Sequence, residues 1–220
     1  MIVERACKEP IPDGAFLNFG IGIPALVGEK LARLNDRIDT SVESGVINGK
    51  PKEGIAFGEA TEFSSVIQQA DLFSFYNGGG IDVAFLGFAE IDREGNINAS
   101  AFGEQLTGAG GFINIAASAR KLVFCGTLTT KGLQLGRTGT NVSIRQEGAV
   151  PKFVEHVQQV TVATNHPDFW DKDIKIITER AVFSLHRGEF ILEELTEGIT
   201  LDAVRQAIPF AIKISPNITL

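Results

Sequence analysis

Short apolar runs alternate with longer amphipathic segments along most of the chain. The runs are bounded by Gly or Asp and are typical of buried strands. They cover residues 16–19, 38–42, 83–88, 122–125 and 174–177. Segments with helical spacing of apolar positions cover residues 24–34, 63–70, 112–120 and 201–208. This alternation predicts an open three-layer α/β/α sandwich with a mainly parallel sheet.

The last third of the chain has a different pattern. Further strands are expected at residues 160–163, 181–185 and 190–195, and alternating positions favour antiparallel pairing at a sheet edge. No Pro/Ser-rich linker, internal repeat or low-complexity segment interrupts the sequence. We therefore expect a single domain over residues 1–220.

Charge and cysteine content narrow the function classes. The 220 residues carry a net charge of −7, which argues against binding to nucleic acid or to an anionic membrane surface. A small anionic ligand is still compatible, because backbone amides bind anions without basic side chains. Cys7 and Cys125 are expected to be unpaired thiols in a reducing compartment. The start of the chain lacks the apolar run of a signal peptide, so we expect a cytoplasmic protein.

Glycines gather in clusters beside the predicted strands, at residues 20–22, 45–58, 78–80 and 108–111. Ligands of open α/β sheets bind outside the carboxyl ends of the strands. We therefore expect the clusters to meet at one edge of the sheet and to form the site.

The first cluster, Gly20 and Gly22, precedes Pro24 at the predicted start of a helix. It predicts either an anion or acyl site at the helix start or a plain strand-to-helix turn. It is not a dinucleotide fingerprint, because Ala25 occupies the place of the third glycine.

Glu43 follows a predicted strand and precedes Gly45. A carboxylate at a strand end beside glycines is open to a substrate and can act as a nucleophile that forms a covalent intermediate. The alternative interpretation is a solvated glutamate in a turn.

Two later clusters have a functional and a structural interpretation each. Gly79 and Gly80 either line the floor of a pocket or allow a close backbone crossing. Gly108, Gly110 and Gly111 either present N–H groups to a developing oxyanion or form a turn that needs positive φ. The three histidines show no ligand spacing, and no metal site is expected.

In this order, the segments resemble the glutamate-bearing (beta or C-terminal) half of the family I coenzyme A transferases, of the short-chain acyl-CoA:carboxylate type. The matching motifs are G-I-G-I-P at residues 20–24, E-x-G at 43–45, G-G-x-D-x-A-x-L-G at 79–87, D-x-x-G-N at 92–96 and G-x-G-G at 108–111.

The resemblance implies a CoA transferase that needs a homologous alpha-type half and forms an oligomer. Glu43 would be catalytic and would carry a glutamyl–CoA thioester in ping-pong exchange. CoA would be a co-substrate, with no permanently bound cofactor. The residues implied for the oxyanion or for CoA are Gly108, Gly110 and Gly111. Those implied for the substrate pocket are Gly20, Gly22, Gly45, Asn48, Gly79 and Gly80.

Some positions depart from the family pattern, and alternatives stay open. Asn48, Lys52, Glu53 and Glu59 replace glycine or small residues beside the expected pocket, so the substrate is not fixed. An acyl-CoA hydrolase on the same scaffold, a non-catalytic CoA-binding subunit and an isomerase-like enzyme of similar fold are the competing hypotheses.

Overall fold

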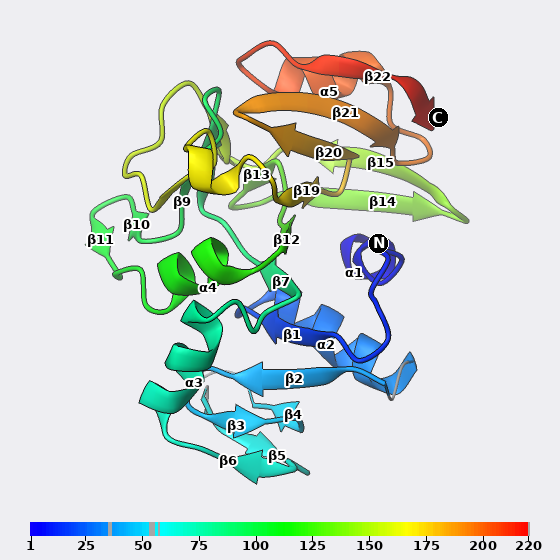
Figure 1. Cartoon of the computed structure of the whole chain (residues 1–220). Coiled ribbons are helices and arrows are strands. Elements are labelled where there is room, and N and C mark those ends of the chain that lie inside the picture. Colours follow the sequence, from blue (N-terminus) through cyan, green and yellow to red (C-terminus); the bar gives the residue numbers. More distant parts are fainter. Residues whose placement is uncertain (35–36, 53–55, 57, 220) are drawn as a thin grey trace. The chain divides into compact units, whose positions relative to one another are not determined.

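The computed structural model describes residues 1–34, 37–52, 56 and 58–219 (Figure 1). Contacts divide the chain into two compact units. The first contains Met1–Gly87 and Gly110–Cys125, and the second contains Phe88–Ala109 and Gly126–Leu220. The single domain expected from the sequence stays a prediction, and each unit is described by itself.

The first unit is built on a mainly parallel sheet with the strand order β12-β7-β1-β2-β3-β6. Strands β12, β7, β1 and β2 run parallel, while β3 and β6 continue the sheet antiparallel. The strands are β1 (Phe16–Phe19), β2 (Asp39–Val42), β3 (Val46–Ile47), β6 (Ser65–Val66), β7 (Val83–Leu86) and β12 (Lys121–Cys125). A separate hairpin pairs β4 (Lys50–Pro51) with β5 (Ala60–Thr61).

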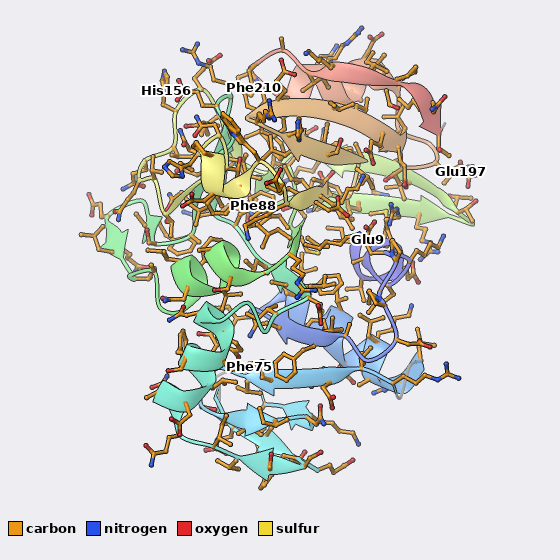
Figure 2. All side chains as sticks on the ribbon, in the orientation of Figure 1. Glu9, Phe75, Phe88, His156, Glu197 and Phe210 are labelled. Atoms are coloured by element: carbon orange, nitrogen blue, oxygen red, sulfur yellow. The ribbon has the colours of Figure 1, made fainter. Side chains whose placement is uncertain are left out.

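Helices cover both faces of this sheet. Successive residues of β1 point to opposite faces. Phe19 packs beside Gly28 of helix α2, and its ring stacks on Phe85 at 5.2 Å. Phe16 contacts Phe75 of helix α3 on the other face, with ring centroids 4.8 Å apart (Figure 2). The helices of the unit are α1 (Ile2–Ala6), α2 (Ile23–Leu34), α3 (Gln69–Asn77) and α4 (Phe112–Ser118).

A buried ion pair ties the segment after α1 to β12. Glu9 is 6 % exposed, and its carboxylate accepts from Arg5 and Lys121, each at 2.7 Å. Lys121 is also buried, so each charge is stabilised by its partner.

The second unit is mostly β. Its larger sheet has the order β22-β21-β20-β19, with antiparallel pairs up to β21 and a parallel pair to β22. These strands are β19 (Asp173–Ile177), β20 (Ala181–His186), β21 (Glu189–Leu195) and β22 (Lys213–Thr219), and α5 (Leu201–Ala207) precedes β22. A four-stranded sheet has the order β17-β8-β9-β18, with β8 (Glu90–Asp92), β9 (Asn96–Asn98), β17 (Phe153–Val154) and β18 (Val162–Ala163). Short pairs join β10 (Ala101–Phe102) to β11 (Gln105–Leu106), β13 (Thr129–Thr130) to β16 (Val150–Pro151), and β14 (Gln134–Thr138) to β15 (Asn141–Gln146). A 3-10 turn covers Pro167–Phe169.

The predicted α/β fold with a mainly parallel sheet is confirmed, as are the principal strands and three of the four helices to within two residues. The turn at residues 92–96 also joins two strands as expected, and Asp92 Oδ1 accepts the N–H groups of Glu94 and Asn96. The helix predicted at 63–70 is wrong. Ser65–Val66 is the edge strand β6, and the helix begins only at Gln69.

Candidate active site

Glu43 is the first residue of the three-residue turn that joins β2 to β3, at the carboxyl end of β2. The N–H of Gly45 closes this turn by donating to the Val42 carbonyl at 2.9 Å. Gly45 has φ +109, and a Cβ there would overlap the carbonyl oxygen of Ile67. The turn therefore requires glycine two residues after the glutamate.

The Gly20–Gly22 turn lies at the same edge of the sheet, because β1 runs parallel to β2. The N–H of Gly20 donates to the Phe85 carbonyl at 2.8 Å, which holds this turn against β7. Gly22 has φ +77, and no heavy atom lies within 4 Å of the place of its missing Cβ. The turn leaves open space beside the carboxyl ends of the strands.

Gly111 meets Glu43 at the start of α4. Its N–H donates to the Glu43 carboxylate. A Cβ on Gly111 would overlap Glu43 Oε2 and would lie 2.7 Å from Phe73 Cζ. Burial raises the pKa of Glu43 above its usual value, and the Gly111 N–H opposes this rise. The result is a partly buried carboxylate held by a backbone donor.

A buried polar group lies on the same face of the sheet as Glu43. Asn18 of β1 donates through Nδ2 to the Tyr76 hydroxyl at 3.3 Å, and the Ser41 and Tyr76 hydroxyls are 2.6 Å apart. Burial raises the pKa of Tyr76, bonds from Ser41 and Asn18 oppose the rise, and the charge of Glu43 adds to it. Tyr76 therefore lies within electrostatic range of Glu43.

Two of the glycines expected in the pocket lie elsewhere. Gly79 and Gly80 follow α3 and precede β7, so they lie at the amino end of that parallel strand. A Cβ on Gly80 would overlap the Phe75 ring, which indicates a close packing contact. The structure does not bring this cluster to Glu43, and the expected gathering of all glycine clusters at one edge is wrong here.

Asn48 also points away from the glutamate. Its Oδ1 accepts the Thr40 N–H at 2.8 Å, and its Nδ2 donates to Asp39 at 2.9 Å and Ser64 at 3.2 Å. Asp39 and Thr40 lie at the amino end of β2, about three residues or 10 Å from Glu43 along the strand, and Ser64 directly precedes β6. The Asn48 side chain therefore stabilises the open end of the β2–β3 hairpin. Of the other departures, Lys52 and Glu59 are exposed and paired at 2.7 Å, and Glu53 lies outside the described residues.

The three glycines of the last cluster have different environments. In the second unit, the Gly108 N–H already donates to the Ser100 carbonyl at 3.1 Å. Gly108 and Gly110 have positive φ, as the turn interpretation requires, whereas Gly111 has φ −78. Gly111 is thus the member of the cluster that faces Glu43.

Sequence reasoning missed Asn18, Ser41 and Tyr76. Asn18 was a usable signal, because it is the single polar residue in the apolar run at 16–19. Ser41 lies two positions before Glu43, which places both on one face of a strand. Tyr76 is the one tyrosine of the chain, and no local pattern around it indicates a site.

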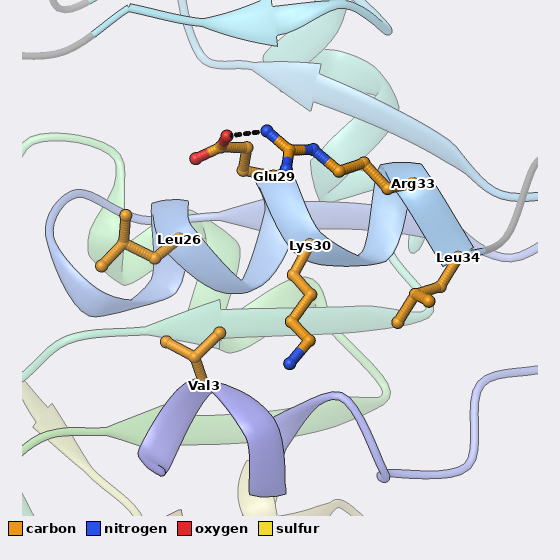
Figure 3. A pocket seen from close by; sticks show the side chains of 6 residues that line it. All are labelled: Val3, Leu26, Glu29, Lys30, Arg33 and Leu34. Carbon is orange, nitrogen blue, oxygen red and sulfur yellow. Dashed lines mark hydrogen bonds and ion pairs between the residues drawn. The ribbon is translucent and has the colours of Figure 1, made fainter.

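A groove between α1 and α2 is separate from this arrangement (Figure 3). It is lined by Val3, Leu26, Glu29, Lys30, Arg33 and Leu34. Most of these belong to the later turns of α2, and none is a predicted site residue. Within the described ranges, no group of His, Cys, Asp or Glu is arranged to hold a metal ion. None of the described helices is long and apolar enough to cross a bilayer.

Comparison with known proteins gives the family. The family model for coenzyme A transferase matches residues 1–207. This chain belongs to the coenzyme A transferase family. Acetate CoA-transferase YdiF of Escherichia coli K12 is 37 % identical over 224 residues, which cover 100 % of this chain and 42 % of YdiF. The beta chain of a probable coenzyme A transferase of Bacillus subtilis is 30 % identical, over 97 % of this chain and 93 % of that protein.

A solved structure of the acyl-CoA transferase YdiF from E. coli O157:H7, described as a thioester complex with CoA, superposes with a TM-score of 0.87 at 33 % identity. It covers 100 % of this chain and 42 % of that one. The chain thus spans about two-fifths of the YdiF proteins and most of the separate beta chain. It corresponds to the beta-type half of the family.

Proposed function

We propose that this chain is the half of a CoA transferase that carries the catalytic nucleophile, Glu43. The enzyme moves CoA between a short-chain acyl-CoA and a carboxylate acceptor, and it needs a homologous alpha-type half. One observation carries the proposal: a partly buried carboxylate at a strand end, held by the Gly111 N–H. The thioester complex of the related YdiF supports it.

The reaction begins with attack on the acyl-CoA. A Glu43 carboxylate oxygen bonds to the thioester carbonyl carbon, and the C–S bond breaks to release CoA thiolate and leave a mixed anhydride. The thiolate then attacks the glutamyl carbonyl and expels the acyl group as a free carboxylate. The glutamyl–CoA thioester remains, and an incoming carboxylate reverses the two steps.

Gly111 has a defined place in this sequence. Its N–H already donates to the Glu43 carboxylate, so the donor is in position when the thiolate attacks the glutamyl carbon and its oxygen gains charge. A preorganised donor of this kind typically contributes about 2.7–4 kcal/mol to transition-state stabilisation. Gly110 is the second candidate for the oxyanion or for CoA, whereas the N–H of Gly108 is already bonded.

Covalent labelling tests the assignment. The active assembly, incubated with acyl-CoA, should gain the mass of CoA on tryptic peptide 38–52, which contains Glu43 as its single glutamate. Borohydride should reduce the thioester and inactivate the enzyme. Glu43→Gln should abolish labelling and turnover with little change in side-chain volume.

Glu59→Gln is the control, because Glu59 is exposed, is paired with Lys52 and lies on the next peptide. Normal turnover by Glu43→Gln, or label on another carboxylate, would refute the proposal. Turnover without an acceptor carboxylate would identify an acyl-CoA hydrolase that uses the same glutamate.

A further inference from the structure

The buried trio of Asn18, Ser41 and Tyr76 joins β1, β2 and α3 through hydrogen bonds but leaves one acceptor unpaired in the part of the chain that the structure describes. All three are at most 5 % exposed, and Asn18 Oδ1 has no hydrogen-bond partner among the described residues. An unpaired buried acceptor destabilises a fold, and apolar residues of similar shape avoid that cost. A polar group kept in a core at this cost calls for an explanation, and a role in the neighbouring site is one.

The hydrogen bonds of the trio leave one hydroxyl proton unused. Tyr76 accepts from Asn18, and a single bond links the Tyr76 and Ser41 hydroxyls. The two hydroxyls have two protons, and that bond uses one of them. The remaining proton belongs to Ser41 or to Tyr76.

The surroundings of this proton include the nucleophile. Ser41 lies two residues before Glu43 at the end of β2, and Phe73 lies one helical turn before Tyr76 on α3. Phe73 Cζ and Glu43 Oε2 both border the missing Cβ of Gly111, and the rings of Phe73 and Tyr76 are 5.2 Å apart. On this side the carboxylate thus lies beside the Phe73 ring, and Tyr76 is the next ring on α3.

The strands and helices around the trio, which are β1, β2, β3, α3 and α4, carry few other charges. Asp39 begins β2 and is bonded to Asn48, and Asp71 is in the first turn of α3. Strands β1 and β3 and helix α4 contain no ionisable residue. Besides burial, the charge of Glu43 raises the pKa of Tyr76.

We propose that Tyr76 is a positioning residue that acts with Ser41: their hydroxyl pair, fixed by Asn18, is a dipole that favours the ionised, attacking form of Glu43. The inference rests on the proposed function of Glu43. A nucleophile in a partly buried site must lose its proton although burial favours the protonated form. The Gly111 N–H opposes that effect, and the hydroxyl dipole is proposed to act in the same direction.

The test is the pH dependence of kcat/KM and of glutamyl–CoA formation in the active assembly. Tyr76→Phe removes the hydroxyl and keeps the ring. We expect it to shift the acidic limb upward by about half a pH unit, because the hydroxyl pair acts on the carboxylate through space and not through a hydrogen bond. Activity should therefore fall about threefold on the acidic side and recover as pH rises. Ser41→Ala should shift the limb in the same direction, and Ser41→Thr, which keeps the hydroxyl, should restore it.

Ser74→Ala is the matched control, because its exposed hydroxyl on α3 donates only to the Ala70 carbonyl. It should leave the profile unchanged. A loss of activity that is equal at every pH, with an unmoved acidic limb in both Tyr76→Phe and Ser41→Ala, would overturn the inference and show a packing role. Failure of the proposed function is distinguishable, because the wild-type assembly would then form no Glu43–CoA adduct.

Discussion

The contact between Gly111 and Glu43 can be disturbed by a single methyl group. Gly111 has φ −78 and ψ −3, a conformation that alanine adopts without strain. The new Cβ would overlap Glu43 Oε2 and would lie 3.1 Å from Glu43 Cδ and 2.7 Å from Phe73 Cζ. Gly111→Ala therefore acts on the carboxylate and the ring, not on the backbone.

The size of the effect follows from these distances. Non-bonded carbon atoms rest at about 3.5–4.0 Å, so Phe73 and Glu43 must move by roughly 1 Å. A displacement of about 1 Å in an active site costs on the order of 10²-fold in rate. We expect kcat to fall about 100-fold, which corresponds to about 2.7 kcal/mol.

Gly78→Ala is a closely matched control. Gly78 has φ −77 and ψ 3, almost the same backbone conformation, but a Cβ there meets only the Phe75 and Ser74 carbonyl oxygens at 3.4 Å. The assay measures kcat and glutamyl–CoA formation for both variants in the active assembly. Thermal unfolding of each variant shows whether it is folded.

Two outcomes would refute the reasoning. Gly111→Ala with a kcat close to that of the wild type would show that the carboxylate is not confined by Gly111. Equal losses in Gly111→Ala and Gly78→Ala would show a general effect of the added methyl group. A folded Gly111→Ala protein that forms the thioester slowly, beside a normal Gly78→Ala, would support the assigned contact.

Two further predictions concern buried charges. Burial raises the pKa of Glu43 above 4.5, so the folded chain binds the carboxyl proton of Glu43 more tightly than the unfolded chain does. Ionised Glu43 therefore destabilises the fold at higher pH. We expect Glu43→Gln to raise the melting temperature at pH 8, with a gain that shrinks toward pH 4.5; a gain independent of pH would contradict this. Burial lowers the pKa of Lys152 from 10.5 to about 8, so the charged lysine destabilises the fold below pH 8 and this cost fades toward pH 10.5. Lys152→Met should therefore raise the free energy of unfolding at pH 7 by roughly 1–2 kcal/mol, once the lost cation–π contact with Phe88 is subtracted. Urea unfolding should show a smaller gain at pH 10 than at pH 7, and a larger gain at pH 10 would contradict the prediction.

The position of Glu43 was predictable because local signals agree there. A β-like run followed by E-x-G defines a strand and a tight turn, and the parallel neighbours place the Gly20–Gly22 turn at the same edge. Gly79 and Gly80 were misplaced because a glycine cluster beside a strand does not by itself show which end of the strand it adjoins. They precede a strand, and a cluster before a parallel strand lies at its amino end.

The segment at residues 63–70 shows how a non-local partner overrides a local pattern. Its apolar spacing indicates a helix, but Val66 pairs with Val46 of β3, and the Ile67 N–H donates to the Gly45 carbonyl at 2.9 Å. These bonds depend on a turn about twenty residues earlier in the chain. The trio of Asn18, Ser41 and Tyr76 likewise joins three distant segments, so no local window reveals it.

The donor that faces Glu43 belongs to the peptide backbone, and this has a consequence for how such a site evolves. A codon change at position 43 replaces the proposed nucleophile but leaves the Gly111 N–H in place, because that N–H belongs to the backbone. A single mutation at position 43 can therefore introduce another side chain, nucleophilic or not, while the Gly111 N–H remains available as a donor. The reverse route is narrow, because any side chain at position 111 enters the space of the carboxylate. Divergence of reaction chemistry on this scaffold is easiest at position 43, with the glycine held constant.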